Sequence, residues 1–117
     1  MGILEDLKDF IGEKNVYFNY SEAKGDCIIL WLYGGISTSS GLRPQVQIKV
    51  KNKSMSVCES VINGIYDKLS PKGNYQKTLD VNGEIMLITP KQQPFYLEKD
   101  SENRHVYVFN VDIIKRR

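Results

Sequence analysis

The stretch QVQIKVKNKSMSVCESVINGIYDKL, residues 45–69, changes its hydrophobic spacing halfway along and so decides the fold class. From Gln45 to Lys51 apolar and polar residues alternate, which is the pattern of a β-strand with one buried face. From Ser54 to Leu69 the apolar residues fall at helical spacing, which predicts an amphipathic helix that packs across the sheet. These apolar residues are Met55, Cys58, Ile62, Ile65, Tyr66 and Leu69. Ser56 and Glu59 have the spacing of a capping box for this helix.

The residues before this stretch predict a short helix and two strands. The apolar residues at helical spacing are Ile3, Leu4, Leu7, Phe10 and Ile11, and Gly12 is a natural stop. Glu5, Asp6, Lys8 and Asp9 are expected on the solvent face of this helix. Residues 16–20 alternate and predict a strand, whereas residues 27–33, CIILWLY, are apolar on both faces. We expect this second strand either to be central and covered on both sides, or to be covered by helices on one side and by another subunit on the other.

The residues after position 69 predict a hairpin, a bend and a long last strand. Residues 77–81 and 84–89 flank Asn82-Gly83, a pair that favours a type I′ turn between two strands. Pro90 and Pro94 cannot donate to a strand ladder, so we expect a bend at a sheet edge between them. Residues 104–114 predict the last strand. Its apolar residues occupy both faces, Val106 and Val108 on one and Tyr107, Phe109, Val111 and Ile113 on the other.

The order of helix, strands, helix and strands predicts the α+β class. We expect a mainly antiparallel sheet, with a mixed sheet as the alternative, of about five to six strands with two helices packed on it. The 117 residues are expected to form a single domain, residues 1–117. The longest apolar run, residues 27–33, is far shorter than the ~20 residues of a membrane-spanning helix, and the start of the chain has no export pattern. We therefore expect a cytosolic chain with reduced thiols.

No set of residues predicts catalysis or cofactor binding. The sole histidine, His105, follows Arg104 at the start of a strand, where an imidazole that contacts backbone or solvent is expected. Cys27 and Cys58 lie in apolar segments, where burial disfavours the thiolate, so both are assigned to the core. The glycines of residues 34–41 do not have the spacing of a phosphate-binding loop. We expect no enzyme activity, no cofactor, no metal ion and no small-molecule substrate.

Lys49, Lys51 and Lys53 alternate along the chain and admit two interpretations. Either they form a solvated strand face, or they contact phosphates in a nucleic-acid-binding accessory domain. The chain has 16 basic and 14 acidic residues and a net charge of +2, so its overall charge gives little support to a polyanionic partner.

The C-terminal part of the chain resembles a known protein family. The stretch QPFYLEKDSENR, residues 93–104, runs into VYVFNV at residues 106–111. Together they resemble the C-terminal part of the phage minor capsid proteins that are grouped with tail-terminator and tail-completion proteins. The earlier elements occur in the same order as in that family, so the resemblance covers nearly the whole chain.

This resemblance implies a structural virion protein that carries out no reaction. Similar proteins form a ring, often a hexamer, that caps the finished tail tube and joins it to the head connector. The implied partners are copies of the chain itself, the tail tube protein and the head connector or completion protein, with no membrane and with DNA only passing through the ring. The implied location is the head–tail junction of the virion, after synthesis in the bacterial host cytoplasm. A head-completion or connector protein of the same virion is the alternative role.

Two segments and one arginine are the candidate protein-interface residues. Residues 34–41, GGISTSSG, have the composition of a mobile surface loop that could order on binding a neighbour. We expect contacts from this loop as far as residue 43, from the bend at residues 90–95, and from an arginine that pairs an acidic group across an interface. The predicted interface residues are Gly34, Gly35, Ile36, Leu42, Arg43, Gln93, Pro94, Phe95 and Arg104.

Overall fold

The computed structural model describes residues 3–19, 24–38, 41–69, 77–81 and 84–115. For residues 3, 34–38, 41–43, 77–81, 84–86 and 115 it describes the backbone alone. Two helices and seven strands are present in this part of the chain. They are α1 (Ile3–Ile11), β1 (Val16–Phe18), β2 (Cys27–Thr38), β3 (Gly41–Asn52), α2 (Met55–Leu69), β4 (Lys77–Val81), β5 (Glu84–Pro90), β6 (Phe95–Lys99) and β7 (His105–Lys115).

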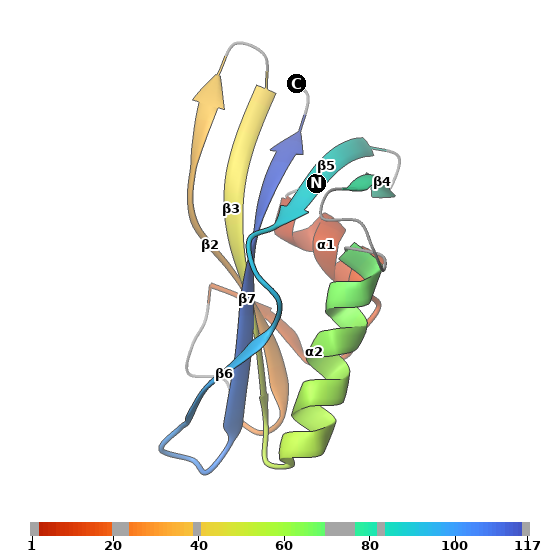
Figure 1. Ribbon diagram of the computed structural model, residues 1–117. Helices are drawn as coiled ribbons and strands as arrows, with labels where there is room; N and C mark the ends of the chain where they lie inside the picture. Colours follow the sequence, from red (N-terminus) through yellow and green to blue (C-terminus); the bar gives the residue numbers. More distant parts are fainter. Residues whose placement is uncertain (1–2, 20–23, 39–40, 70–76, 82–83, 116–117) are drawn as a thin grey trace.

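The strands form one sheet in the order β1-β2-β3-β7-β5-β4, and β6 also pairs with β7 (Figure 1). β1 runs parallel to β2, and the other described pairs are antiparallel. The predicted α+β class and mainly antiparallel sheet are confirmed, and the sheet is mixed. About five to six strands were expected, and seven are described. β5 and β6 both pair with the same edge of β7, one after the other.

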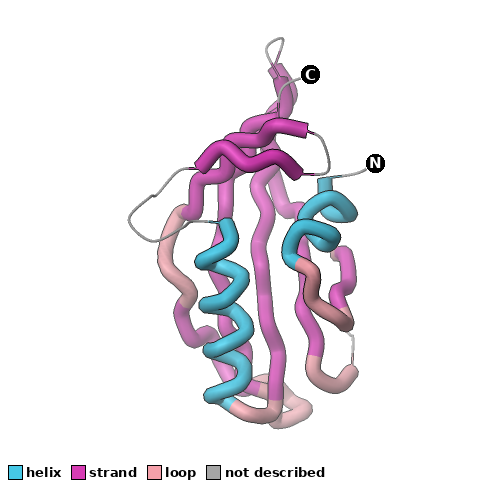
Figure 2. Tube along the Cα trace, turned by 90° about the vertical axis from the view of Figure 1, so that its right-hand side faces the viewer, coloured by secondary structure: helices cyan, strands magenta, loops and turns pink. Residues whose placement is uncertain are grey.

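Both helices lie on the same face of the sheet (Figure 2). Period-two alternation points Val46, Ile48 and Val50 of β3 toward them, and Phe109, Val111 and Ile113 of β7 share that face. Each fully buried aliphatic or aromatic side chain of this kind contributes roughly 1.5–3 kcal/mol. The helices bring Leu4, Leu7, Ile11, Cys58, Ile62, Ile65 and Leu69 to the same core.

α1 begins and ends as predicted, but one of its acidic residues is placed differently. The N–H of Gly12 donates to the carbonyl oxygen of Lys8 at 3.0 Å, and Gly12 has a φ of 73°, a conformation that favours glycine at the end of a helix. Asp6 was expected on the solvent face, yet only 2% of it is exposed. The predicted position of Asp6 is therefore wrong, because the buried side of the helix is wider than its apolar residues alone indicate.

The start of α2 is capped by a different serine from the predicted one. The Oγ of Ser54 accepts a hydrogen bond from the N–H of Val57 at 3.3 Å, which makes Ser54 the N-cap. The predicted capping box of Ser56 and Glu59 is wrong, since Glu59 instead accepts a hydrogen bond from the hydroxyl of Tyr107 at 3.2 Å. Met55 was expected in the apolar stripe but is 44% exposed, because it lies at the first position of the helix.

The loop predicted at residues 34–41 is mostly strand. Residues 34–38 continue β2 and residues 41–43 begin β3, in register from Gly34 opposite Gln45 to Thr38 opposite Gly41. A strand ladder needs only backbone N–H and C=O groups, so the lack of apolar side chains does not prevent it. A register shift between Leu32 and Gly34 inserts an extra residue into β2, as a β-bulge does. Residues 39 and 40 lie outside the described part.

The predicted bend between Pro90 and Pro94 is confirmed. β5 ends at Pro90, β6 begins at Phe95, and both strands pair with β7. Within the bend, the N–H of Lys91 donates to the carbonyl oxygen of Asn110 at 2.8 Å, and the side-chain oxygen of Gln92 accepts from the N–H of Asn110 at 3.0 Å. A side-chain amide thus replaces the strand partner that the bend removes.

Replacing Ser54 by alanine should lower the free energy of unfolding by about 1 kcal/mol, because the N–H of Val57 loses its cap. Chemical denaturation of the purified protein measures this change. Ser56→Ala is the matched control and should cost less than half as much. Equal losses in the two variants would contradict the assignment of the cap to Ser54.

Candidate interaction surface

The face of the sheet opposite the helices, here called the helix-free face, is only partly covered. At its base Cys27, Ile29, Val106 and Val108 are each at most 4% exposed. Lys51 and Lys49 stand opposite Cys27 and Ile29 in the register, and their aliphatic stems share this face. The predicted cover from two directions is thus achieved here by the helices on one side and by long side chains of the same sheet on the other.

Farther along β2 the cover ends. Trp31, Leu32 and Tyr33 are 38, 41 and 45% exposed, although they continue the apolar run that is buried from Cys27 to Leu30. Of these, Leu32 lies opposite Val46 and so shares the helix side of the sheet. The sequence signalled these residues through the strand that is apolar on both faces, but they were not included among the predicted interface residues. Exposed aromatic side chains that lie together on a strand are typical of a protein-binding surface.

A second exposed apolar group lies on β6, at the opposite margin of the helix-free face. Phe95, Tyr96 and Leu97 are 41, 40 and 46% exposed. Phe95 pairs with Val108 and so shares its face, whereas Tyr96 packs its ring edge-on against Tyr107 with a centroid distance of 5.3 Å. Of the predicted bend residues, Gln93 is exposed and Pro94 is half-buried.

The predicted interface residues are only partly brought together. The backbones of Gly34, Gly35, Ile36, Leu42 and Arg43 lie in the outer halves of β2 and β3, which rise beyond the helices in Figure 1. The side chains of these five residues lie outside the described part. Gln93, Pro94 and Phe95 lie across β3 and β7 from β2. The two predicted regions are therefore on different margins of the sheet.

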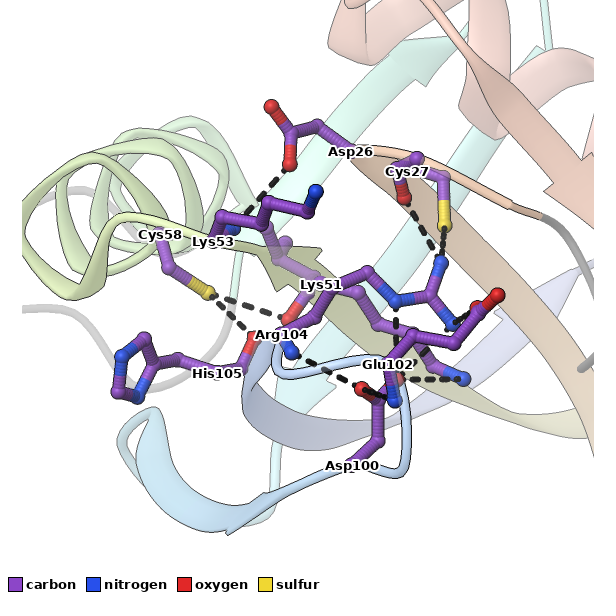
Figure 3. Close-up of polar contacts among 11 residues, drawn as sticks. Asp26, Cys27, Lys51, Lys53, Cys58, Asp100, Glu102, Arg104 and His105 are labelled. Atoms are coloured by element: carbon purple, nitrogen blue, oxygen red, sulfur yellow. Dashed lines mark hydrogen bonds and ion pairs between the residues drawn. The ribbon is translucent and has the colours of Figure 1, made fainter.

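Arg104 lies in a charged cluster at the turn between β6 and β7 (Figure 3). Its side chain is 4% exposed, and Nη2 lies 2.9 Å from both Oδ2 of Asp100 and Oε2 of Glu102. Nε also donates to Oδ2 of Asp100 at 2.9 Å, and Nη1 donates to the carbonyl oxygen of Gly25 at 2.8 Å. The guanidinium thereby ties the turn to the start of β2. These partners belong to the same chain, which favours a stabilising role for Arg104, and its pairing with another subunit stays a prediction.

Asp100 is the carboxylate on which this turn depends. Its Oδ1 accepts hydrogen bonds from the N–H groups of Glu102 and Arg104 at 3.0 and 2.9 Å. Burial alone would raise the pKa of Asp100, but hydrogen bonds from the backbone and side chain of Arg104 and from the backbone of Glu102 outweigh it, so the pKa is lowered. The folded state therefore favours the charged carboxylate.

The lowered pKa of Asp100 predicts an acid-sensitive part of the stability. Its contribution is complete above the ordinary carboxyl pKa near 4, declines as the pH falls below that value, and is lost once the pH falls through the lowered folded pKa. Asp100→Asn should be less stable than the wild type at neutral pH, and the difference should shrink in acid. Thermal unfolding from pH 7 to pH 2 measures this. A difference that is constant over that range would contradict the role of the charge.

The lysine row expected on a solvated strand face does not form. Lys51 is 8% exposed, and its Nζ lies 3.9 Å from Oδ2 of Asp100. Burial, followed by the nearby charge of Lys51, lowers the pKa of Lys49. Lys53 lies beyond the end of β3, where its N–H donates to Oδ1 of Asp26 at 3.1 Å. The three lysines therefore do not present one continuous row of solvated charge.

The two cysteines are buried as expected, whereas the imidazole of His105 contacts the side chain of Tyr96 rather than only backbone or solvent. Cys27 and Cys58 are free and buried. The Sγ of Cys58 donates to the carbonyl oxygens of Val50 and His105 at 3.2 and 3.4 Å, and burial raises its pKa to about 11. Burial also raises the pKa of Cys27. The ring Nδ1 of His105 lies 3.1 Å from the hydroxyl of Tyr96. The hydrogen bond between Cys58 and His105 therefore involves the backbone carbonyl of the histidine and not its ring.

Both thiols should resist alkylation in the folded protein. At pH 8 a thiol with a pKa of about 11 is almost wholly protonated, and burial blocks access to it. Iodoacetamide labelling followed by mass spectrometry should therefore show two unmodified cysteines in the native state and two modified ones in denaturant. Rapid native labelling of Cys58 would contradict the burial of its thiol, on α2, against β3 and β7.

Two further features of the described residues bear on function. No group of three or more His, Cys, Asp and Glu side chains is placed there to hold a metal ion. Neither helix in this part of the chain has the length and apolar character needed to cross a membrane.

Comparison with known proteins identifies one family. The family model described as "Bacteriophage tail terminator protein" matches residues 2–117. A chain of the solved structure "Virion of native gene transfer agent (GTA) particle" is similar to this chain, with a TM-score of 0.45 and 12% identity, over 93% of this chain and 84% of that chain. This similarity is too low to indicate a function. No curated protein matches the sequence.

Proposed function

This chain belongs to the bacteriophage tail terminator family, and we propose from this premise that it caps the completed tail tube and joins it to the head connector. As a member of this family it is a structural component of the phage virion with a role in tail completion, and the family is not one of enzymes. The observation that carries the proposal is the match over residues 2–117, which includes both helices and all seven described strands.

We propose that copies of the chain, each folded as a single domain, form a ring at the head–tail junction. By the resemblance the ring is a hexamer that meets the tail tube protein on one side and the head connector or completion protein on the other, with DNA passing through it. A closed ring requires two different, complementary surfaces on each copy. The apolar groups on β2 and β6 lie on opposite sides of the central strands, so each copy has distinct surfaces for contacts with its neighbours in the virion.

Phe95 is the large apolar residue of the predicted interface whose side chain the structure describes, and it is exposed. It is a large apolar side chain, 41% exposed, on a strand whose five residues are all exposed. Burial of such a side chain against a partner favours binding. We propose that Phe95, with Gln93 and Pro94 beside it, contacts a virion neighbour, and that the outer halves of β2 and β3, including Gly34, Gly35, Ile36, Leu42 and Arg43, form a further contact.

The role can be tested with phage particles made without this protein. Electron microscopy should show tail tubes of uncontrolled length that are not joined to heads, and addition of the purified protein should restore tubes of uniform length. Tails of normal length together with heads that fail to join them would contradict the tail-terminator role and support the head-completion role instead.

The variant Phe95→Asp should bind tail tubes at least about tenfold more weakly than the wild type, because a charge replaces an apolar contact at the interface. Co-sedimentation with tubes made without the protein measures the bound fraction. Val57→Asp is the matched control, since Val57 is 46% exposed but lies on α2, on the other face of the sheet. Equal binding by the Phe95→Asp variant and the wild type would remove Phe95 from the interface.

A further inference from the structure

We propose that neighbouring copies join edge to edge, with the outer edge of β2 in one copy paired to the outer edge of β4 in the next. The sheet would then continue across each boundary between subunits. This inference rests on the ring proposed above and specifies the contact that builds it.

The outer edge of β2 is covered for only part of its length. β1 pairs only with the first part of β2, residues 28–30. Asn19 then ends the coverage, since its N–H donates to the carbonyl oxygen of Leu30 at 3.0 Å and its side-chain oxygen accepts from the N–H of Leu32 at 2.8 Å. From residue 33 to residue 38, no strand in the described ranges pairs with this edge of β2. Backbone groups without a strand partner among the described residues can pair with an added strand.

The register identifies which N–H groups point outward. The N–H of Ile28 donates to the carbonyl oxygen of Asn15, just before β1, and the N–H of Leu32 donates to the side-chain oxygen of Asn19. Up to this point the N–H groups of even-numbered residues therefore face the outer edge. The extra residue between Leu32 and Gly34 moves this pattern to the odd-numbered residues, namely Gly35 and Ser37. Gly35 lies opposite Pro44, which has no N–H to donate, and this agrees with an outward-facing Gly35.

The sequence of this edge lacks most of the features that protect strands from pairing. Residues 31–38, WLYGGIST, contain no charged residue and no proline, and the shift after Leu32 is their only irregularity in pairing with β3. β6 is different, because Pro94 precedes it, it contains Glu98 and Lys99, and its register shifts between Tyr96 and Glu98. The unprotected edge is therefore the one on β2, and a partner for it must be an extended strand.

The other end of the same sheet provides such a strand. β4 is the last strand in the sheet order, and among the described elements it pairs only with β5. Val81 lies opposite Glu84 with two residues between them, which is the register of a hydrogen-bonded pair at the end of a hairpin, so the N–H groups of Thr78 and Asp80 face outward. In Figure 1 β4 and the outer half of β2 lie on opposite sides of the molecule.

A second copy of this chain is the partner that fits both edges. A contact between two opposite edges of one sheet is heterologous, so it repeats from copy to copy and closes into a ring when the rotation allows. Among the described residues, no strand of the same subunit pairs with the outer edge of β4 or with that of β2 beyond β1. One contact therefore accounts for both ends of the sheet.

Proline substitutions test this pairing without disturbing the ladder inside the subunit. Ser37→Pro and Thr78→Pro each remove one outward N–H, whereas the controls Ser37→Ala and Thr78→Ala keep it. Full-length proteins are added to tail tubes made without the protein, and rings are counted by electron microscopy and weighed by native mass spectrometry. Each proline variant should form at least about tenfold fewer rings than the wild type, and the alanine variants should match the wild type.

A mixture of the two proline variants gives the sharper result. Ser37→Pro keeps an intact β4 edge and Thr78→Pro keeps an intact β2 edge, so together they should form a pair that cannot extend. Thermal unfolding reports whether each variant folds, and Gly35→Pro and Asp80→Pro replace a variant that does not. Folded proline variants that form full rings, or that form no pair when mixed, would overturn the edge pairing and leave the tail-terminator role intact. If the wild type forms no ring and leaves tail length unchanged, the proposed function fails together with this inference.

Discussion

β7 shares its backbone hydrogen bonds with three strands, and this sharing fixes where the surfaces of the molecule lie. β3 pairs along one edge of β7, and β5 and β6 pair in succession along the other. The bend at residues 91–94 lets the chain leave β5 and return to the same edge as β6. As a result β6 has five exposed residues, including Phe95, and the turn that follows it is tied by Asp100 and Arg104 to the start of β2.

The placement of both helices on one face leaves the other face to side chains alone. At the base of the sheet, long charged side chains are sufficient to bury Ile29 and Val108. No comparable cover in the described residues reaches Trp31 and Tyr33, and from residue 33 onward the outer edge of β2 has no described strand partner. Exposed apolar area and unpaired backbone thus occur at the same place on the molecule. Contact with another protein would stabilise both, which agrees with the assembly proposed for this virion component.

Much of the fold follows from local patterns in the sequence. The alternation at residues 45–51, the helical stripe ending at Leu69 and the two strands at residues 77–81 and 84–89 depend on short-range physics, and these elements were predicted with the correct type. The turn predicted at residues 82–83 lies outside the described part of the chain. The errors occur where local composition competes with longer-range pairing. Residues 34–38 look like a loop because they carry little apolar area, yet each of them lies opposite a residue of β3 in the strand register.

Long-range contacts also explain why the candidate surface was predicted only in part. Asp6 and Lys51 were expected in solvent, and tertiary packing buries them both. Arg104 was predicted to pair an acidic group across an interface, whereas its described acidic partners lie within its own turn, in a backbone conformation that spacing does not reveal. Trp31 and Tyr33 were correctly read as part of an apolar strand. Their exposure depends on where β1 stops and on the side that the helices occupy.

Hydrogen exchange at the backbone amides of residues 33–38 tests the central claim most directly, which is that an open sheet edge is closed by assembly. We expect the outward-facing amides of Gly35 and Ser37 to exchange quickly in the free protein and to become strongly protected in protein bound to tail tubes, while amides in the middle of β7 are protected in both states. Equal, rapid exchange of Gly35 and Ser37 in the free and the tube-bound protein would contradict it.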